Sequence, residues 1–397
     1  MRETRWHAGL VLLGLIVLMP AWVSQAGADE LRVNVPEVSG SKQVGTRSFQ
    51  LVDRSRSAGF DQSGKRRLMV QVYYPLADRS QTRCRQAPYM ASATERSLLG
   101  FIAIDRPVTV DTGVCAGGKV RGRALPLLVF SHAYTASRGV YSSLLFDLAS
   151  RGFMVASVDH TYDSFNVAFP GGKSVDGLFG SPLSSKPITE PELVSLVQMR
   201  VRDLRFVTTR LLRESSRKRS WLGGRIDRGR IGVFGHSLGG ATAARVATVD
   251  RRFRSSADVD GSLFGEWPLT VRTHKPFLLL VAEGGLGQVL PQDKACDFFA
   301  GATGPKMAWQ LDGAKHLSFS DFQSLAPQLA ESYPEWPFAS LYPAIIGDLE
   351  PAASIRSQRE GIARFFRATL KPAPGVGERP DPPSGITPAS GGQLTCR

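Results

Sequence analysis

The chain has 397 residues, of which 42% are hydrophobic and 21% are charged, and its formal net charge is +14. This composition is typical of a globular protein with enough apolar material for a core, and it excludes a broadly disordered chain. The Lys and Arg residues are scattered, with tight clusters only at 213–219 and 251–254. The absence of a nucleic-acid-binding motif in the sequence excludes nucleic acid as an expected partner. The charge therefore indicates a solvated basic face or, alternatively, contact with an anionic membrane surface.

The N-terminal residues 1–28 are predicted to be a signal peptide. A short basic start precedes the apolar run 9–22, and Ala26 and Ala28 fit a small-residue cleavage site. The mature chain would then begin near Asp29 and be exported, to a periplasm or to the medium. An uncleaved membrane anchor is the alternative, but the run is shorter than the ~20 residues that a spanning helix needs.

Four cysteines occur in the exported part of the chain: Cys84, Cys115, Cys296 and Cys396. An even number in an exported protein predicts two disulfides, although three pairings are possible. We favour Cys84 with Cys115 and Cys296 with Cys396. None of the four has the spacing of a metal ligand, and the chain lacks a nucleotide-binding glycine motif, so we expect neither a metal nor a cofactor.

Residues 29–371 are predicted to form one α/β domain. It is expected to begin with two antiparallel strands, and a loop-rich insertion at 78–123 follows them. Strands and helices then alternate, interrupted by a second insertion at 164–188 that is rich in Gly, Pro and Ser. The expected strands are 47–55, 68–75, 125–131, 153–160, 230–235, 255–260, 276–282 and 307–311, and the expected helices are 140–151 and 191–215. Such alternation predicts a mainly parallel central sheet with helices on both faces. Residues 372–397, rich in Pro and Gly, are predicted to be a tail.

The sequence GHSLG at 235–239 follows the apolar strand RIGVF and precedes a run of small residues suited to a helix. In this strand–turn–helix context a serine is held exposed on a sharp turn, and the flanking Gly235 and Gly239 relieve the crowding. Ser237 is therefore the predicted nucleophile, with His236 beside it in the turn. A purely structural Ser-Gly turn is the alternative.

A serine nucleophile needs a base and an acid that orients the base. His316 follows the last strand in a glycine-containing loop, whereas His274 precedes a strand and would lie at the opposite edge of the sheet. We therefore predict His316 as the base. Asp260, at the end of strand 255–260, is the predicted acid, because Asp258 lies deeper in the same strand. Glu283, at the end of the next strand, is the alternative acid.

The tetrahedral intermediate of an ester needs N–H donors for its oxyanion. The backbone N–H of Leu238, at the start of the helix after the nucleophile, is one candidate. The second is the N–H of Tyr134, in the loop after strand 125–131. His132 is expected to shape this loop. His160 and Asp163 are expected either to line the pocket or to fix the loop by hydrogen bonds.

Three segments together resemble the platelet-activating factor acetylhydrolase family, of the plasma and intracellular type II kind, within the α/β-hydrolases. The first is PLLVFSHAYTASRGVYSSLLFDLASRGFMVASVDH, the second is GVFGHSLGGATA, and the third is DVDGSLFG followed at a distance by GAKHLSFSDF. The resemblance implies an α/β-hydrolase fold with Ser237 as nucleophile, Asp260 as acid and His316 as base. It also implies that Tyr134 and Leu238 form the oxyanion hole.

The same resemblance implies calcium-independent cleavage of short or oxidised acyl chains at the sn-2 position of phospholipids. The chain differs from the family in the AYT sequence after His132, where a glycine is usual, and in the insertions at 78–123 and 164–188. Loops at this edge of the sheet build the substrate pockets, so these differences concern the identity of the ester. The sequence thus predicts an exported serine carboxylic ester hydrolase. The alternatives are a cutinase-like polyesterase or general lipase and a hydrolase-fold binding protein without catalysis.

Overall fold

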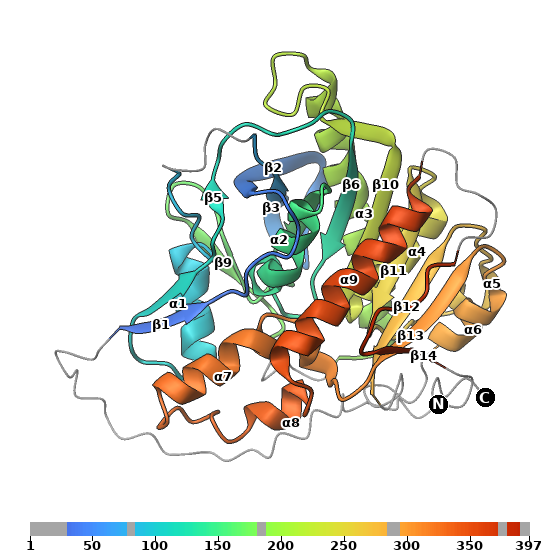
Figure 1. The fold of residues 1–397 in the computed structure, drawn as a ribbon. Coiled ribbons are helices and arrows are strands. Elements are labelled where there is room, and N and C mark those ends of the chain that lie inside the picture. Colours follow the sequence, from blue (N-terminus) through green and yellow to red (C-terminus); the bar gives the residue numbers. More distant parts are fainter. Residues whose placement is uncertain (1–29, 78–83, 181–187, 284–293, 372–378, 390–397) are drawn as a thin grey trace.

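The protein is described by a computed structural model that covers residues 30–77, 84–180, 188–283, 294–371 and 379–389. Its centre is a ten-stranded sheet in the order β14-β13-β12-β11-β10-β6-β7-β3-β2-β5 (Figure 1). These strands are β2 (Val44–Gly59), β3 (Gln62–Pro75), β5 (Cys115–Ala116), β6 (Leu125–Ser131), β7 (Met154–Asp159), β10 (Ile226–His236), β11 (Phe253–Val259), β12 (Phe277–Ala282), β13 (Lys306–Leu311) and β14 (Ile386–Pro388). Two small pairs lie outside it, β1 (Leu31–Asn34) with β4 (Val108–Asp111) and β8 (Asn166–Ala168) with β9 (Ser174–Asp176).

The middle of the sheet is parallel, from β13 through β12, β11, β10 and β6 to β7. Strands β3 and β2 continue it in antiparallel order, as the sequence predicted for the first two strands. All residues of β7 and β12 are buried, because helices cover both faces of the sheet. The predicted mainly parallel sheet is therefore confirmed.

Two helical layers cover the faces (Figure 1). Helices α2 and α9 lie on one face in one hydrophobic cluster, while α3 and α4 lie on the other in a second cluster. The helices are α1 (Ser92–Phe101), α2 (Ser142–Ser150), α3 (Glu190–Ser216), α4 (Leu238–Val249), α5 (Trp267–Thr270), α6 (Ala295–Gly301), α7 (Phe322–Ser332), α8 (Tyr342–Ile346) and α9 (Pro351–Thr369), with short 3₁₀ turns η1 (Arg138–Tyr141) and η2 (His316–Phe319). The start of α3 is fixed by a capping box between Thr189 and Glu192 and by Pro191 in its first turn.

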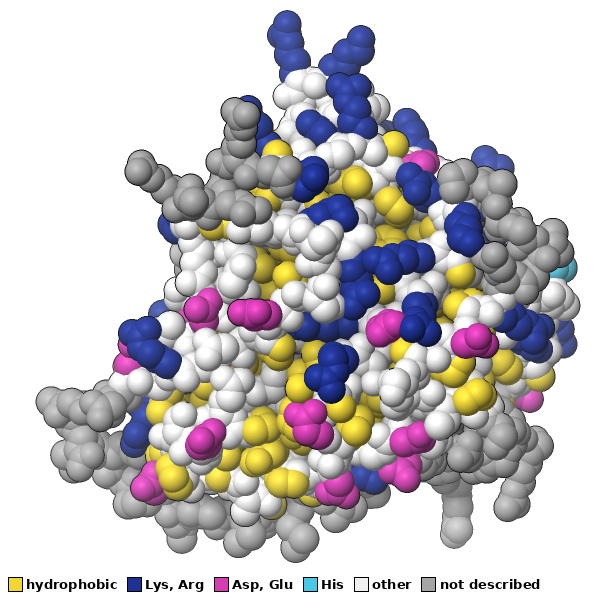
Figure 2. Space-filling view, viewed as in Figure 1, with side chains coloured by type: hydrophobic (Ala, Val, Ile, Leu, Met, Phe, Trp, Pro, Cys, Tyr) yellow, Lys and Arg dark blue, Asp and Glu magenta, His cyan; other side chains and the backbone are white. Residues whose placement is uncertain are grey.

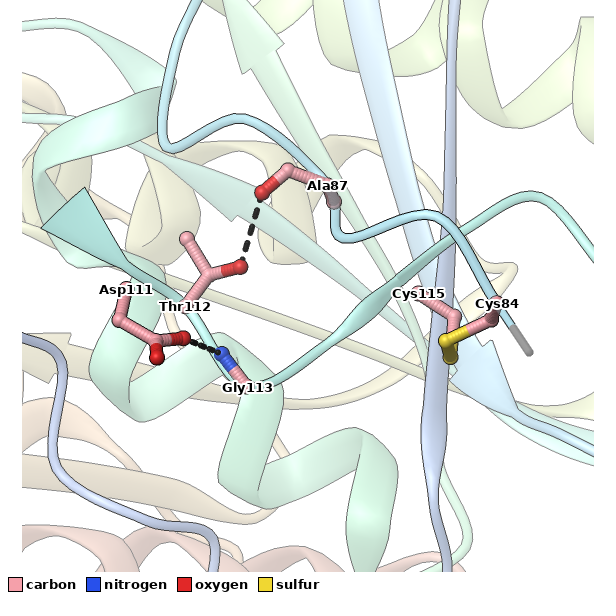
Figure 3. Close-up of a disulfide and its surroundings, with 6 residues drawn as sticks. All are labelled: Cys84, Ala87, Asp111, Thr112, Gly113 and Cys115. Atoms are coloured by element: carbon pink, nitrogen blue, oxygen red, sulfur yellow. Dashed lines mark hydrogen bonds between the residues drawn. A yellow bond between two sulfur atoms is a disulfide. The ribbon is translucent and has the colours of Figure 1, made fainter. Parts of the chain in front are cut away.

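The first insertion, predicted as a loop-rich segment over 78–123, contains α1, β4 and β5. Its two-residue strand β5 adds to the edge of the main sheet beside β2. The predicted disulfide between Cys84 and Cys115 is confirmed, and it anchors this strand with a Cα–Cα distance of 5.5 Å (Figure 3). Nearby, the Thr112 hydroxyl donates to the carbonyl of Ala87 at 2.8 Å. The insertion therefore has secondary structure of its own and is joined to the main sheet.

The predicted tail also differs from the expectation of an irregular segment, because Ile386–Pro388 forms β14 and pairs antiparallel with β13. The second predicted disulfide joins Cys296 to Cys396, and Cys396 lies outside the described residues. So does the predicted signal peptide. In the part of the chain that the structure describes, no helix is both long enough and apolar enough to cross a membrane.

Charge is distributed unevenly over the face seen in Figure 2. Lys and Arg side chains crowd its upper part, above the end of α3, while most Asp and Glu side chains lie on the lower part near α7 and α8. The loop after α3 contributes three exposed basic residues, Arg217, Lys218 and Arg219. On this face the basic side chains thus gather at the upper end and extend into the middle.

Candidate active site

The turn between β10 and α4 holds Ser237 in a strained conformation. Its backbone has φ 58° and ψ −124°, a combination that costs a residue with a side chain about 1–3 kcal/mol. Hydrogen bonds hold it there: Ser237 N–H donates to the Val259 carbonyl at 2.9 Å, and Gly240 N–H donates to the Ser237 carbonyl at 2.8 Å. Such strain persists only where the surroundings over-determine the conformation, which points to a functional serine.

The two flanking glycines are required by close backbone packing. A Cβ on Gly239 would lie 2.0 Å from the Ser131 carbonyl oxygen, and one on Gly235 would lie 2.3 Å from the carbonyl carbon of Gly239. Both distances are far below any real Cβ contact. The turn is therefore pressed against the end of β6 and the loop that follows it, where only glycine fits.

Asp260 and His316 are brought together at the carboxyl edge of the sheet. Asp260 directly follows β11, and its carboxylate contacts the His316 ring, with Oδ2 2.6 Å from Nδ1. Its other oxygen accepts the Ala282 N–H at 2.9 Å, which fixes the carboxylate plane. An Nδ1–H bound to a carboxylate leaves Nε2 of the neutral imidazole as an acceptor. Asp260 is 8% exposed and His316 is 30% exposed, so the pair is buried on the acid side and open on the histidine side.

His316 lies beside the turn that carries Ser237. The ring of His236, the residue before Ser237, is 4.5 Å from the His316 ring, centroid to centroid. Among the described residues, the Ser237 hydroxyl and the His316 ring are not hydrogen-bonded to each other. Contacts of this kind are commonly long in proteins without substrate and tighten when it binds.

One group of residues has donor atoms close enough for a metal ion: those of His236, Asp260 and His316 lie within 4.8 Å of one another. In this group His316 Nδ1 and Asp260 Oδ2 contact each other, and His236 Nδ1 contacts the Tyr141 hydroxyl at 3.0 Å. The polar atoms are thus arranged as a hydrogen-bonded acid–base pair with a supporting histidine.

Two residues considered as alternatives lie elsewhere. Glu283 accepts the Gly313 N–H at 2.9 Å and so supports the loop that leads to His316. His274 is exposed and contacts the Thr303 hydroxyl at 2.6 Å, just before β12 and therefore at the opposite edge of the sheet. Asp258 is completely buried within β11. The structure does not bring any of these three to His316 in the way that it brings Asp260.

The two predicted oxyanion donors come from different segments: Tyr134 from the loop after β6, and Leu238 from the start of α4. Leu238, at the first position of α4, is 3% exposed, and Tyr134 is half-buried. Among the described residues, neither backbone N–H has an acceptor, whereas the neighbouring Ala133 N–H donates to the Tyr141 hydroxyl at 3.1 Å. Thr135 follows with φ 55°, a second strained residue. The amides of both predicted oxyanion donors are thus without an acceptor in the described part of the chain.

The polar residues around this loop fix its shape. His132 is fully buried between the Ser164 hydroxyl at 2.8 Å and the Ala133 carbonyl at 2.7 Å. His160 contacts the Ser131 hydroxyl at 3.0 Å. For His160 and Asp163, the structure favours the loop-fixing role over the pocket-lining one.

Several residues of this region were missed by the sequence analysis, above all Tyr141, Arg200 and Asp203. A signal existed for two of them. Arg200 and Asp203 interrupt the apolar face of α3 and lie three residues apart on that face, which is unusual for an amphipathic helix.

Buried histidines make the stability of the protein dependent on pH. Desolvation lowers the pKa of His132 and of His236 well below the usual 6.5, and it lowers that of His160 to about 4 although Asp203 opposes it. The unfolded chain takes up protons near pH 6.5 and the folded chain does not, so this stability is present above pH 6.5 and is lost as the pH falls toward 4.

We therefore expect the thermal unfolding midpoint to fall when the pH is lowered from 7.5 to 5, as measured by circular dichroism. In the variant His160→Gln the decrease should be shallower, because one group no longer takes up a proton on unfolding. A decrease in His160→Gln that is as steep as in the unmodified protein would contradict the burial of a neutral His160.

Comparisons with known proteins agree with this architecture. A family model described as platelet-activating factor acetylhydrolase, isoform II, matches residues 27–170 and 208–334. A probable 1-alkyl-2-acetylglycerophosphocholine esterase of Arthroderma benhamiae is 28% identical over 248 residues, or 58% of this chain and 60% of that protein. The platelet-activating factor acetylhydrolase of Bos taurus is 28% identical over 279 residues, or 62% of this chain and 60% of that protein. The chain thus spans about 60% of the length of these two curated relatives.

A solved structure extends the similarity over nearly the whole chain. A ferulic acid esterase from Streptomyces cinnamoneus superposes with a TM-score of 0.72 and 30% sequence identity, covering 90% of this chain and 99% of that one. The predicted α/β-hydrolase fold is confirmed by this similarity together with the strand order.

Proposed function

Because the chain belongs to the platelet-activating factor acetylhydrolase, isoform II, family, we propose that it is a serine hydrolase of carboxylic esters. The observation that carries the proposal is the 2.6 Å contact between Asp260 and His316 beside the strained Ser237. Relatives named as an acetylhydrolase and as esterases support the reaction class.

The proposed reaction has two half-reactions. Ser237 Oγ attacks the ester carbonyl carbon while His316 Nε2 takes the hydroxyl proton, and Asp260 stabilises the imidazolium through Nδ1–H. The oxyanion of the tetrahedral intermediate accepts hydrogen bonds from the N–H groups of Tyr134 and Leu238. His316 then gives its proton to the departing alkoxide, which leaves as an alcohol.

The acyl-enzyme is hydrolysed by the same groups. His316 takes a proton from water, the resulting hydroxide attacks the acyl carbon, and the Ser237 oxygen leaves and is reprotonated by His316. The products are one carboxylic acid and one alcohol. The described residues supply every proton transfer in this scheme.

As substrates we propose short acyl esters such as sn-2 acetyl or oxidised phospholipids. The relative from Bos taurus is named as an acetylhydrolase, and the family model that matches this chain has the same description. The disulfide between Cys84 and Cys115 supports an exported enzyme, in a periplasm or the medium, because disulfides persist in oxidising compartments.

A second candidate is a general esterase of other esters, and the similarity to a ferulic acid esterase over 90% of the chain favours it. To distinguish the two candidate functions, we would compare the rates of hydrolysis of four substrates. These are an sn-2 acetyl phospholipid in vesicles, p-nitrophenyl acetate, methyl ferulate and a solid polyester. A value of kcat/KM at least tenfold higher for the phospholipid supports the first candidate, and the reverse order supports the second.

A fluorophosphonate probe tests the nucleophile itself. We expect one probe per protein molecule, attached at Ser237 and identified by peptide mass spectrometry, with loss of esterase activity in proportion to labelling. Labelling should disappear after heat unfolding, because the reactivity depends on the assembled site. A folded protein that hydrolyses esters without labelling at Ser237 would refute the assignment.

A further inference from the structure

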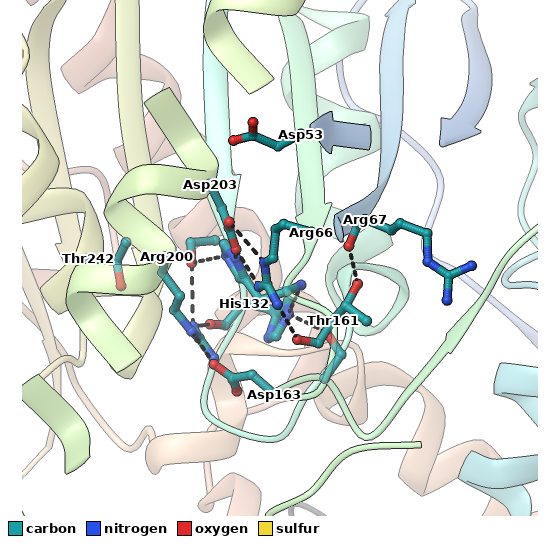
Figure 4. Close-up of polar contacts among 12 residues, drawn as sticks. Asp53, Arg66, Arg67, His132, Thr161, Asp163, Arg200, Asp203 and Thr242 are labelled. Carbon is teal, nitrogen blue, oxygen red and sulfur yellow. Dashed lines mark hydrogen bonds and ion pairs between the residues drawn. The ribbon is translucent and has the colours of Figure 1, made fainter. Parts of the chain in front are cut away.

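A buried arginine in the middle of α3 lies directly behind the oxyanion loop. The side chain of Arg200 is fully buried, and it forms a two-pronged ion pair with Asp163, with Nε–Oδ2 at 2.6 Å and Nη2–Oδ1 at 2.7 Å (Figure 4). Buried ion pairs cost desolvation energy, and well-packed apolar residues are often as stable in their place. The presence of this pair therefore calls for an explanation other than stability.

The remaining guanidinium hydrogens all point to the loop after β6. Nη1 donates to the carbonyl of His132 and lies 3.4 Å from the Ser131 hydroxyl, and Nη2 donates to the carbonyl of Ala133 at 3.2 Å. Arg200 thus contacts three consecutive residues, and the residue that follows them is Tyr134.

The partner carboxylate contacts the same loop beyond Tyr134. Asp163 Oδ1 accepts the N–H of Thr135 at 3.4 Å. The ion pair therefore holds the backbone immediately before and immediately after Tyr134. Thr135 has φ 55°, and a strained residue of this kind keeps its conformation only when its surroundings hold it.

The loop is also packed against the nucleophile turn. The Ser131 carbonyl, next to those that Arg200 binds, would be 2.0 Å from a Cβ on Gly239. A shift of this loop would therefore change the position of the Tyr134 amide relative to Leu238 and Ser237. Errors of about 1 Å in such positions can cost around 10²-fold in rate.

We propose that Arg200, with Asp163 as its counter-charge, is a positioning residue that holds the Tyr134 N–H in place for the oxyanion. This inference rests on the proposed function, since it assigns a role within the same reaction. Arg200 acts through the backbone of residues 131–133 and does not touch the ester. A lysine cannot replace it, because one ammonium cannot make the planar set of contacts that the guanidinium makes.

A second buried ion pair, between Arg66 in β3 and Asp203 in α3, offers a control. Arg66 binds Asp203 with Nη2–Oδ2 at 2.6 Å, and its Nη1 donates to the carbonyls of Ala58 at 3.1 Å and Thr161 at 2.7 Å (Figure 4). Arg66 is 1% exposed. Both arginines are buried and bind a buried Asp, and Arg66 itself does not contact residues 131–133. Asp203 differs from Asp163 in that it also contacts Arg56 and the ring of His160.

The test compares Arg200→Lys with Arg66→Lys for p-nitrophenyl acetate hydrolysis and for binding of a trifluoromethyl ketone, which forms an oxyanion on the nucleophile. For Arg200→Lys we expect kcat to fall about 10- to 100-fold with KM within threefold, and the ketone to bind weaker by a similar factor, as for loss of part of one oxyanion donor. Arg66→Lys should keep kcat and ketone affinity within threefold at a comparable loss of thermal stability.

The double variant Arg200→Met/Asp163→Asn keeps the test decisive if the lysine variant is unstable, because it removes both charges together. We expect it to fold and to show the same loss of kcat and ketone affinity. Retention of both quantities within twofold in either folded Arg200 variant would overturn the proposal, as would an equal loss in Arg66→Lys. Failure of the proposed function can be told apart from failure of this inference. In the former case the unmodified protein would neither hydrolyse esters nor be labelled at Ser237.

Discussion

Replacing Ser237 with alanine is expected to lower kcat for p-nitrophenyl acetate by about 10⁴-fold or more, because the acyl-enzyme can no longer form. A residual rate above the uncatalysed one should remain from the oxyanion donors. The measurement is steady-state hydrolysis together with circular dichroism. Alanine keeps the Cβ, so the strained backbone at φ 58° is unchanged and the folded structure should be retained.

Ser216→Ala is the control, since Ser216 is exposed at the end of α3 and, among the residues that the structure describes, its hydroxyl donates only to the Arg213 carbonyl. It should leave kcat unchanged. Full activity in folded Ser237→Ala would remove Ser237 from the mechanism, and with it the proposed function.

Asp260→Asn is expected to lower kcat by about 10³- to 10⁴-fold with little change in KM, as replacement of the acid does in other serine hydrolases. The amide oxygen would continue to accept the Ala282 N–H, which turns the amide nitrogen toward His316 Nδ1. The imidazole must then carry its proton on Nε2, and that tautomer cannot accept the proton of Ser237.

The matched variant is Glu283→Gln, which changes the alternative acid in the same way. Its carboxylate accepts the Gly313 N–H, a bond that an amide oxygen can also accept, so kcat should stay within about threefold. Measured kcat and KM for both variants decide between the two acids. A large loss in Glu283→Gln with a small loss in Asp260→Asn would identify Glu283 as the acid.

The parallel core of the fold could be predicted from the sequence because its signals are local. The apolar runs at 125–131 and 276–282 end at glycine, polar or charged residues, and the structure has β6 at Leu125–Ser131 and β12 at Phe277–Ala282. The pattern over 78–123 carried no such signal. Strands β4 and β5 pair with β1 and β2, helix α1 packs against β8, and the disulfide joins Cys84 to Cys115; all these partners are distant in sequence.

The candidate catalytic residues could be predicted from the sequence, whereas the buried residues that hold the surrounding loops in place could not. The turn at 235–239 carries a local motif, and chain order narrowed the base to His316. The sequence favours Asp260 as the acid and leaves Glu283 as the alternative, because both follow strands; the spatial contact of 2.6 Å with His316 supports Asp260, whose role remains a prediction. The pairing of Arg200 with Asp163 could not be read from the chain, since it joins α3 to a loop 37 positions away.

The outermost strand on each side of the large sheet is very short. Neither of these two strands belongs to the part of the chain in which strands and helices alternate. The three-residue β14 pairs with β13, and the two-residue β5, anchored through Cys84–Cys115, pairs with Gly45 and Thr46 at the start of the long strand β2. Uncovered edges present free N–H and C=O groups on which another chain can add a strand and start aggregation. Reduction of this disulfide would remove the anchor of β5 and so leave the edge of β2 unpaired at Gly45 and Thr46 as well. The disulfide would then limit how much of this edge is open to another chain, independently of the catalytic groups.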